Sequence, residues 1–568
     1  MNNFFTKRIN HVFVMVFLVL VIYPGIKISA ENQIAISEKS YPSLSRDWED
    51  ISLLYNNIYH NSSEVDEEIN RFNLLVPELI DIDTIGHSYE GKDIRVLRIT
   101  NENRDYQKAK TLVVSHHHGR EQITVESALR FILYLLNNYQ ENSKITEYID
   151  YQEIFVIPTV NPDALDIVVD QGDYWLRKNL RPWDDDSDGL YEEDHVEDVN
   201  MDGIVSSFDV YDNTNPANPI YQYTYYEGID NDLDGKINED QYGYTDLNRN
   251  YDSHWRDGDG WSDDTLSQIY PGPTPFSEPE TQTVRNFMLQ HNFGMAYSLH
   301  SGTNATLFTE EDYGWVEPSL YWNMVLDYRQ ILPPSYTDIY FKPNSVPQSH
   351  EEPSAALAGS WDTWAYFERN VLAPITFEIY NNLTSILPAA ETVLEENSTH
   401  LILEWKSIYG YFTPEDAYIE ALWTDIQPAF DYLLENTPRL YFLDIGASYL
   451  EHSEDRIVVS IDFMNLSPRI KPNQQINFCD SSFIPISTHI MVAGGQSYLW
   501  IFETYLSNLE NVDGNYTFYI GNDYVGYRLF SIQITEDTGS GFTIGLSIIG
   551  LIIVSISLQK LLRKKKKI

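Results

Sequence analysis

Apolar residues follow two different spacings along most of the chain. Short continuous runs predict buried strands, whereas apolar residues three and four positions apart predict amphipathic helices. The strand-like runs lie at 111–114, 154–160, 292–299 and 373–379, and helical stretches lie at 123–136, 278–289 and 414–434. This alternation predicts an α/β fold with a mixed sheet, in one domain that ends near residue 436.

Two further elements are expected ahead of the first buried run. Residues 41–76 carry apolar positions at helical spacing, which predicts a helix. Residues 85–100 alternate on both sides of Tyr89-Glu-Gly-Lys92, a pattern typical of a hairpin turn. We therefore assign residues 31–436 to a single α/β domain.

The pattern changes after residue 436. Residues 437–534 consist of short alternating apolar runs separated by Pro, Gly and Asn. Such runs predict a small all-β domain with a sandwich-like architecture.

Both ends of the chain carry uncharged apolar runs. Residues 1–30 combine two basic residues with a run too short to span a membrane comfortably, which predicts a signal peptide. A retained N-terminal anchor is the alternative. Residues 541–562 predict a C-terminal transmembrane helix, and the basic residues 563–568 predict a cytoplasmic tail. Together they predict a single-pass protein of the cell membrane whose folded domains are extracellular.

Charge and cysteine content exclude two classes of protein. The formal net charge of -48 is far too acidic for a nucleic-acid-binding protein. The single cysteine, Cys479, excludes a framework of intrachain disulfides.

Residues 183–240 form an acidic insertion with 18 Asp and Glu against one Lys. Three times, acidic or amide residues alternate with others ahead of a glycine, which is typical of calcium loops with oxygen ligands at alternate positions. We expect at least two structural Ca²⁺ ions, and a disordered acidic loop is the alternative. The candidate ligands are Asp184, Asp186 and Asp188, then Asp198, Asn200, Asp202 and Asp209, then Asp230, Asp232 and Asp234.

A second candidate metal site follows the apolar run 111–114. His118 and Glu121 lie three residues apart in the turn after this run, where they could bind one metal ion from one side. A polar loop with a chance histidine cluster is the alternative. A catalytic zinc needs a third protein ligand and an open position for water. His300, at the end of the run 292–299, is the candidate for this third ligand.

Glu378 lies within the apolar run 373–379. A buried strand does not carry a carboxylate without a partner, so Glu378 could accept a proton from zinc-bound water. A core glutamate paired with an arginine is the alternative. Arg177 lies just before the acidic insertion and Arg249 just after it. A guanidinium can bind a carboxylate with two hydrogen bonds or stabilise an oxyanion.

In chain order, the motifs His-x-x-Glu, Asn-Pro-Asp, Arg-Lys, Asp-x-Asn-Arg-Asn, His-Ser and Phe-Glu resemble the zinc metallocarboxypeptidases of the carboxypeptidase A/B type. The resemblance covers residues 45–435. It implies an α/β/α fold and an enzyme that hydrolyses the C-terminal peptide bond of peptides or proteins. It also implies individual roles. These are zinc ligation by His118, Glu121 and His300, general-base catalysis by Glu378, oxyanion stabilisation by Arg177, substrate binding by Arg120, Asn248 and Arg249, and orientation of the first zinc histidine by Asp246.

The chain departs from the family pattern at one position. The family usually has a substrate-capping tyrosine shortly before a Gly-Ser-x-Asp stretch, which is Gly359-Ser-Trp-Asp362 here. Glu352 stands at the apparent position of that tyrosine. Trp361 falls near the residue that sets side-chain preference, and its bulk argues against a preference for basic side chains.

Two other functions are compatible with the sequence. The first keeps the metal site but changes the substrate to cell-wall peptides or small acyl-amino-acid conjugates, cleaved by an amidase. The second is an inactive calcium-binding surface protein that functions in adhesion. The complete ligand set and Glu378 count against the second of these alternatives.

Overall fold

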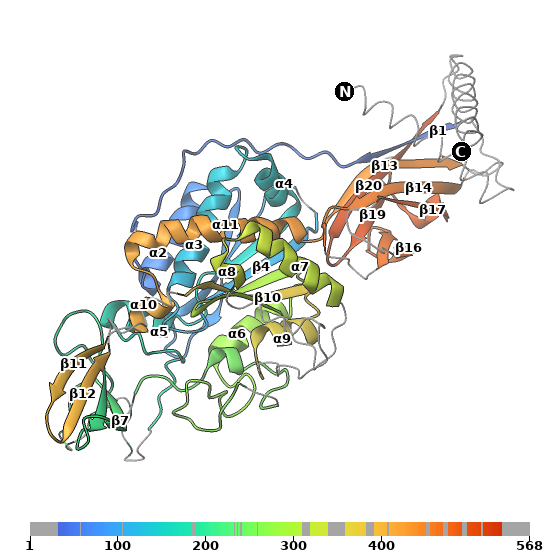
Figure 1. The fold of residues 1–568 in the computed structure, drawn as a ribbon. Helices are drawn as coiled ribbons and strands as arrows, with labels where there is room; N and C mark the ends of the chain where they lie inside the picture. Colours follow the sequence, from blue (N-terminus) through green and yellow to red (C-terminus); the bar gives the residue numbers. More distant parts are fainter. Residues whose placement is uncertain are drawn as a thin grey trace, which may run out of the picture.

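The computed structural model describes residues 32–536, apart from 57, 105, 185–188, 190, 192–193, 232, 234, 236, 239–240, 258–259, 309–317, 339–357, 382–390, 406–407, 450–454, 470–474, 491–496 and 513–514 (Figure 1). The predicted signal peptide, transmembrane helix and cytoplasmic tail, at 1–30, 541–562 and 563–568, lie outside the described residues.

The predicted fold class included a C-terminal transmembrane helix, and this part of the prediction is wrong. Within the described ranges, no helix is long and apolar enough to cross a membrane. The longest of them, α11 (Ile419–Asn436), has 18 residues. It carries Glu420, Asp425, Asp431 and Glu435, and charged side chains are costly inside a bilayer.

A seven-stranded mixed sheet lies at the centre of the described part of the α/β domain (Figure 1). Strand β4 is parallel to β5 and β8, and β8 is parallel to β10, whereas β2, β3 and β9 run antiparallel to their neighbours. The carboxyl ends of β4, β8 and β10 therefore meet at one edge of the sheet. In spatial order the strands are β2 (Ile80–His87), β3 (Asp93–Ile99), β5 (Gln152–Ile157), β4 (Ala109–Ser115), β8 (Met295–His300), β10 (Ala373–Tyr380) and β9 (Thr303–Phe308).

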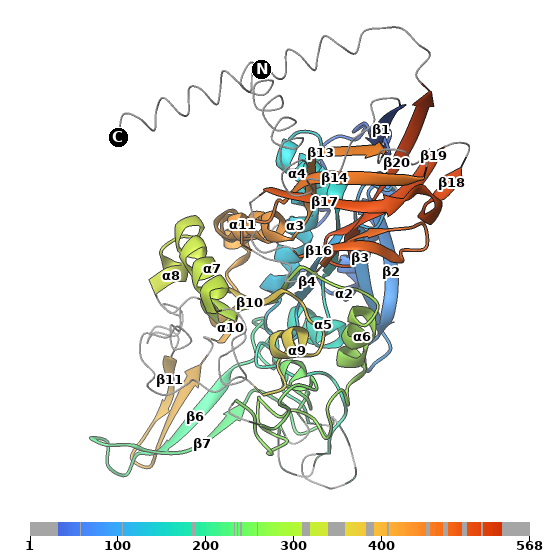
Figure 2. The ribbon, with the colours of Figure 1, turned by 90° about the vertical axis from the view of Figure 1, so that its right-hand side faces the viewer.

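Helices pack against both faces of this sheet (Figure 2). Side chains of successive strand residues alternate between the faces, so Val113 belongs to one core while Leu112 and Val114 belong to the other. The first face is covered by α2 (Ser62–Leu75), α3 (Ile123–Asn138), α4 (Ser143–Tyr151), α7 (Pro318–Ile331) and α11, and the second by α6 (Pro279–Met288) and α9 (Trp361–Phe367). The remaining helices of the described domain are α5 (Pro162–Gln171), α8 (Ser335–Asp338) and α10 (Ile408–Phe412).

The helix predicted over 41–76 is wrong in its first half, because α2 begins only at Ser62. Asn61 is the N-cap residue of this helix. Its side chain accepts a hydrogen bond from Glu64 N, and the Glu64 side chain accepts one from Asn61 N, each of 3.0 Å. The segment before Asn61 bonds instead to helix side chains, as when Ile51 N donates to Asn137 Oδ1 at 2.8 Å.

His60 connects this N-terminal segment to α2 and α3. The ring is fully buried, with Nδ1 2.8 Å from Glu126 Oε1 and Nε2 3.8 Å from Glu68 Oε1. Burial by itself lowers the pKa of His60, but the hydrogen bond to Glu126 and the negative charges of Glu126 and Glu68 outweigh it and raise the pKa to about 9. His60 is therefore a charged residue in the folded protein at neutral pH.

We expect the stabilisation from His60 to disappear in mild alkali. A folded-state pKa above the ordinary value of 6.5 stabilises the protein fully below 6.5, and the effect is lost as the pH rises through 9. The difference between these values corresponds to about 3 kcal/mol. Urea unfolding at pH 6 and pH 9.5 should show a smaller pH dependence in His60→Gln than in the wild type. The control is His291→Gln, because the pKa of His291 in the folded protein is lowered to about 4, so its ring supplies no stabilisation that alkali could remove and the substitution should not reduce the pH dependence. An identical pH dependence in His60→Gln and wild type would contradict the prediction.

The acidic insertion contributes two strands to a separate four-stranded antiparallel sheet (Figure 1). Its β6 (Ser207–Asp212) and β7 (Ile220–Tyr226) form a hairpin. The other two strands, β11 (Glu391–Glu396) and β12 (His400–Trp405), come from a segment beyond β10, and β12 pairs with β6 from His400 to Trp405. A pairing between segments so distant in sequence leaves no local signal.

The C-terminal strands form a two-sheet β-domain around one apolar core. One sheet contains β13 (Leu440–Tyr449), β14 (Arg456–Asn465) and β17 (Ser497–Tyr505). The other has the order β1 (Asn32–Glu38), β20 (Gly526–Glu536), β19 (Asn515–Asn522), β15 (Gln475–Cys479) and β16 (Pro485–Ile490), with β18 (Glu510–Val512) also beside β19. Thus β1, from the start of the described chain, pairs with β20 near its end.

Candidate metal centre

His118 and Glu121 lie in the turn between β4 and α3, at the carboxyl edge of the sheet. His116 begins this turn with a left-handed φ of 64°, and Glu121 N donates to His118 O at 3.1 Å. Both His118 and Glu121 are only 2% exposed. The turn therefore holds an imidazole and a carboxylate side by side in a buried position.

His300, the last residue of β8, completes the cluster. Because β8 lies next to β4 in parallel register, its carboxyl end reaches the same edge of the sheet. The His118 Nδ1 atom lies 2.7 Å from Glu121 Oε1, and His300 Nδ1 lies 3.0 Å from Glu121 Oε2. The two Nδ1 atoms are 3.2 Å apart. Each of the three side chains thus offers one ligand atom, and these atoms lie within 4.8 Å of one another.

These distances fit a zinc ion. Two nitrogen ligands bound tetrahedrally at about 2.05 Å lie about 3.3 Å apart, close to the separation of the two Nδ1 atoms. The charges of His118 and His300 outweigh burial and hold the pKa of Glu121 well below its ordinary value. An anionic carboxylate between two imidazoles is a typical donor set for zinc. Among the described residues, this triad is the only group of three or more His, Cys, Asp or Glu side chains placed to bind one metal ion together.

Asp246 connects the metal site to Arg177. Asp246 is fully buried, and its Oδ1 lies 3.1 Å from His118 Nε2, on the side of the ring opposite the triad. Its Oδ2 accepts hydrogen bonds from Arg177 Nε and Nη2, at 3.0 and 2.8 Å. The charges of Arg177 and His118 outweigh burial and hold the pKa of Asp246 well below its ordinary value. Asp246 therefore orients both a metal ligand and a cationic side chain.

Arg177 lies directly beside the triad. Its Nη1 is 3.2 Å from His118 Nδ1 and 3.7 Å from Glu121 Oε1. The side chain is 12% exposed, so it borders both the buried triad and the open side of the site. A cation in this place can stabilise negative charge that develops on a bound carbonyl oxygen.

The two other histidines of the turn have different partners. His116 Nδ1 lies 3.0 Å from Thr159 Oγ1, and its Nε2 lies 2.9 Å from Gly119 O. His117 stacks on the His300 ring with centroids 5.3 Å apart. These two side chains shape the turn and support His300 without joining the triad.

Glu378 lies on β10 directly beside His300 on β8, in a parallel pair. Among the described residues, its buried Oε2 has no hydrogen-bond partner. Burial, and next the charge of Glu121, raise the pKa of Glu378 well above its ordinary value, against the opposing charges of Arg177 and Arg249. A second carboxylate close to Glu121 calls for a cation at the triad. Glu378 thus combines proximity to the metal ligands with an unused acceptor atom.

Asn248 and Arg249 belong to the short 3₁₀ helix η1 (Leu247–Arg249) that follows Asp246. Asn248 Oδ1 accepts a hydrogen bond from Trp361 N at 2.8 Å, so this amide is already engaged in holding α9. Arg249 donates from Nε to Gly260 O at 2.6 Å and from Nη1 to Asn248 O at 2.7 Å. Within the described residues, its Nη2 has no hydrogen-bond partner. Arg249 is therefore the better placed of the two to bind an anion.

Arg120 lies close to Arg177, whose charge adds to burial in lowering the pKa of Arg120 to about 10. Its Nη1 donates to Trp175 O at 3.4 Å and to Gln268 Oε1 at 3.3 Å, and its guanidinium carbon lies 4.2 Å from the centroid of the Phe412 ring. Glu352, at the apparent position of the capping tyrosine, lies outside the described residues. Trp361 is fully buried at the start of α9.

Asn179 is a residue of the site that the sequence motifs did not single out. Its N donates to Thr245 O, and its Oδ1 accepts from Thr245 N, both at 3.1 Å. Its Nδ2 donates to Glu278 Oε2 at 2.9 Å. These bonds hold the segment of Arg177 against the segment of Asp246, so the two sides of the acidic insertion meet at the metal centre. The only signal in the sequence was its position two residues after Arg177.

The calcium candidates do not gather into a site among the described residues. Each of the three loops forms the same kind of turn, in which a glycine with positive φ donates its N–H to the first aspartate of the loop. The pairs are Gly189 and Asp184 at 3.1 Å, Gly203 and Asp198 at 2.6 Å, and Gly235 and Asp230 at 3.0 Å. Asp209 instead lies in β6 and accepts from Thr224 Oγ1 on β7. Asp186, Asp188, Asp232 and Asp234 lie outside the described residues. Asn200 and Asp202 support the turn, since Asp202 N donates to Asn200 Oδ1 and Ile204 N to Asp202 Oδ1. Calcium binding stays a prediction from the sequence.

The fold and the His–Glu–His triad define a zinc protein of the α/β/α class. Residues 65–426 match the family model described as zinc carboxypeptidase. The match covers more than half of the chain, so this chain belongs to the zinc carboxypeptidase family, and the resemblance seen in the motifs is confirmed.

Individual relatives cover the chain to different extents. A zinc carboxypeptidase of Saccharothrix mutabilis subsp. capreolus is 35% identical over 127 residues, which are 22% of this chain and only 29% of that protein. Carboxypeptidase B of Astacus astacus is 23% identical over 353 residues, which are 59% of this chain and 91% of that protein. Among solved structures, the carboxypeptidase A from Helicoverpa armigera is 17% identical with a TM-score of 0.43, covering 66% of this chain and 72% of that chain.

Proposed function

We propose that this protein is a zinc-dependent carboxypeptidase that hydrolyses the C-terminal peptide bond of peptides or proteins. The observation that carries the proposal is the position of Glu378, a half-buried glutamate beside the zinc ligand His300, whose buried Oε2 has no hydrogen-bond partner among the described residues. Membership of the zinc carboxypeptidase family supports the same reaction.

Each residue of the site has a task in this reaction. His118, Glu121 and His300 would hold the zinc ion, which would polarise the scissile carbonyl and lower the pKa of water to about 7. Glu378 accepts the proton of the attacking water and passes it to the leaving amine. Arg177 stabilises the negative charge that develops on the carbonyl oxygen.

Substrate binding explains why the enzyme acts on chain ends. Arg249 binds the C-terminal carboxylate of the substrate through its unpaired Nη2, while its Nη1 is held by the backbone carbonyl of Asn248. Arg120 contacts the peptide further from its end. A carboxylate clamp of this kind places only the last peptide bond at the metal.

Digestion of a peptide library by residues 31–538 tests the proposal. We expect release of single C-terminal amino acids and no cleavage of peptides whose C-terminus is amidated, because the carboxylate is then missing. Cleavage of cell-wall peptides or acyl-amino acids without release of C-terminal residues from ordinary peptides would favour the amidase. Full zinc occupancy without hydrolysis of any of these substrates would favour an inactive surface protein. The extracellular location stays a prediction from the N-terminal pattern.

A further inference from the structure

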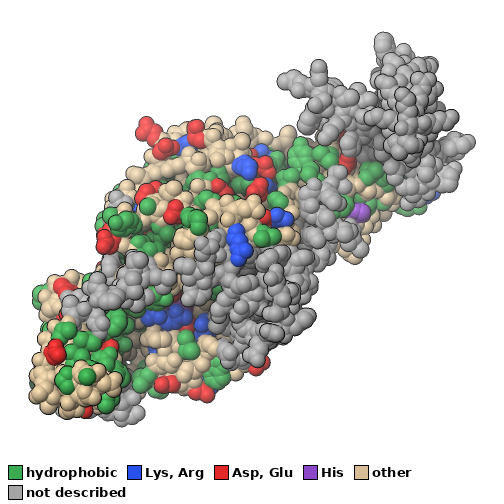
Figure 3. Space-filling model, in the orientation of Figure 1, with side chains coloured by type: hydrophobic (Ala, Val, Ile, Leu, Met, Phe, Trp, Pro, Cys, Tyr) green, Lys and Arg blue, Asp and Glu red, His purple; other side chains and the backbone are tan. Residues whose placement is uncertain are grey.

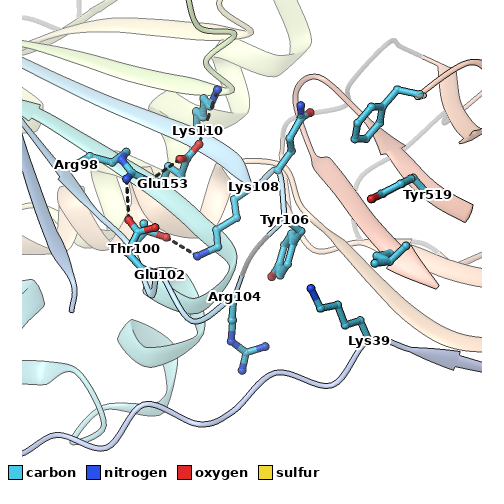
Figure 4. A pocket seen from close by; sticks show the side chains of 13 residues that line it. Lys39, Arg98, Thr100, Glu102, Arg104, Tyr106, Lys108, Lys110, Glu153 and Tyr519 are labelled. Atoms are coloured by element: carbon cyan, nitrogen blue, oxygen red, sulfur yellow. Dashed lines mark hydrogen bonds and ion pairs between the residues drawn. The ribbon is translucent and has the colours of Figure 1, made fainter. Parts of the chain in front are cut away.

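A cavity of about 520 Å³ lies where the α/β domain meets the β-domain (Figure 4). Backbone contacts join the domains beside it, since Tyr527 N donates to Gln107 O at 2.8 Å and Lys108 forms a β-bridge with Gly526. Gly526 has a φ of +77°, and a Cβ atom there would lie 2.1 Å from Gln107 O. The close approach of the two backbones at this glycine sets the shape of the cavity.

This cavity is distinct from the metal centre. Lys108, in its wall, immediately precedes β4, whereas the zinc ligand His118 follows the other end of the same strand. Seven strand residues at about 3.3 Å each separate the two sites by more than about 20 Å. A molecule in the cavity would not touch the triad.

Positive charge dominates the wall, although the chain as a whole has a net charge of -48. Two carboxylates, Glu102 and Glu153, face these cations, and both pair with Arg98, at 2.8 and 3.0 Å. The wall therefore holds five cationic side chains against two carboxylates, and Arg104 also pairs with Asp150 at 2.8 Å. Acidic side chains are scattered over the face of the molecule drawn in Figure 3. The cationic residues of the wall are Lys39, Arg98, Arg104, Lys108 and Lys110.

Lys108 is the most unusual of these cations, because it is only 3% exposed. Its ammonium donates to Thr100 Oγ1 at 2.6 Å (Figure 4) and to Asn101 O at 2.7 Å, which are both neutral acceptors. Among the described residues, no carboxylate oxygen lies within 4.0 Å of it. Burial lowers the pKa of Lys108 to about 8. A buried ammonium without a counter-ion is costly, and a bound anion would offset this cost.

The opposite wall of the cavity is apolar and belongs to the β-domain. Phe483, Tyr519 and Leu529 line it, and the rings of Phe483 and Tyr519 lie 4.5 Å apart. A cavity with a cationic wall, an apolar wall and this volume suits a small organic ligand. We propose that the cavity binds a small organic anion, whose carboxylate or phosphate group compensates Lys108 and whose apolar part contacts Phe483, Tyr519 and Leu529.

Titration calorimetry with benzoate on the purified protein tests this proposal. We expect saturable binding to the wild type, at least 10-fold weaker binding to Lys108→Met, and unchanged binding to Lys144→Met, a control that removes one exposed lysine elsewhere. Binding that is equal in Lys108→Met belongs to the catalytic cleft, where Arg249 also attracts carboxylates, and would overturn the proposal. So would the absence of any binding to the wild type.

Two further measurements keep the result unambiguous. Lys39→Met changes an exposed cation of the same wall and should weaken benzoate binding several-fold, which decides the matter if Lys108→Met fails to fold. Inorganic phosphate supplies the anionic group without an apolar part. Phosphate that binds as tightly as benzoate would overturn the role assigned to the apolar wall.

Discussion

Replacing Glu378 with glutamine is expected to reduce kcat by about 10²- to 10⁴-fold, the usual contribution of a positioned acid or base. Glutamine has nearly the same shape, so it fits on β10 beside His300, but its amide cannot accept a proton from water. Glu378 Oε2 has no hydrogen-bond partner among the described residues, so the substitution breaks no bond of the resting protein. The loss should therefore appear in kcat, with little change in stability.

Zinc content must be measured on the same samples, because a variant that lost its metal would be inactive for another reason. We expect one zinc per chain in Glu378→Gln. The matched control is Glu280→Gln, which replaces a buried glutamate whose pKa is likewise raised by burial, to about 8. Glu280 lies on α6 and is mostly protonated at pH 7, so glutamine resembles its resting state and activity should be retained. Full activity in Glu378→Gln would remove the general base from the proposed mechanism.

Replacing Asp246 with asparagine is expected to reduce zinc affinity by about 10- to 100-fold, the usual effect of losing a partner of a metal-binding histidine. One carboxylate serves both His118 and Arg177. An amide can accept a hydrogen bond from only one of them and turns its NH₂ group toward the other. We therefore expect weaker metal binding together with a lower kcat at saturating zinc, because Arg177 loses its position.

Competition with a chelator of known affinity measures the first effect, and assays in excess zinc measure the second. Asp150→Asn is the control, because Asp150 is also a buried carboxylate that pairs with an arginine, Arg104, at 2.8 Å. It lies away from the triad and should change neither quantity. If excess zinc restored the full kcat of Asp246→Asn, Asp246 would orient His118 alone and have no role in positioning Arg177.

The elements around the metal centre could be predicted because their signals are local. The apolar runs that became β4, β5, β8 and β10 are buried on both faces, so each is a nearly continuous run. The metal ligands and Glu378 lie in or directly after three of these strands, where a polar residue after an apolar run is conspicuous. In such cases the residues and their neighbours carry the information.

Other features depend on partners far away in the chain. The first half of the helix predicted over 41–76 does not form, because backbone groups there bond to side chains of α2 and α3, which local spacing cannot show. Strand β1 pairs with β20, and β6 pairs with β12, across very long separations. Asn179 gained its role only when the segments on the two sides of the acidic insertion came together.

The sequence alone determined the family, the residues of the His–Glu–His triad and the positions of the buried strands along the chain, because these follow from residue types and spacings. The tertiary structure decided how the residues share their contacts. It showed one carboxylate, Asp246, serving two cationic partners, Arg249 retaining an unpaired nitrogen while Asn248 holds α9, and Lys108 buried without a counter-ion between two domains. Such facts depend on which distant groups meet in space and on the burial that results, and neither quantity is encoded in local pattern.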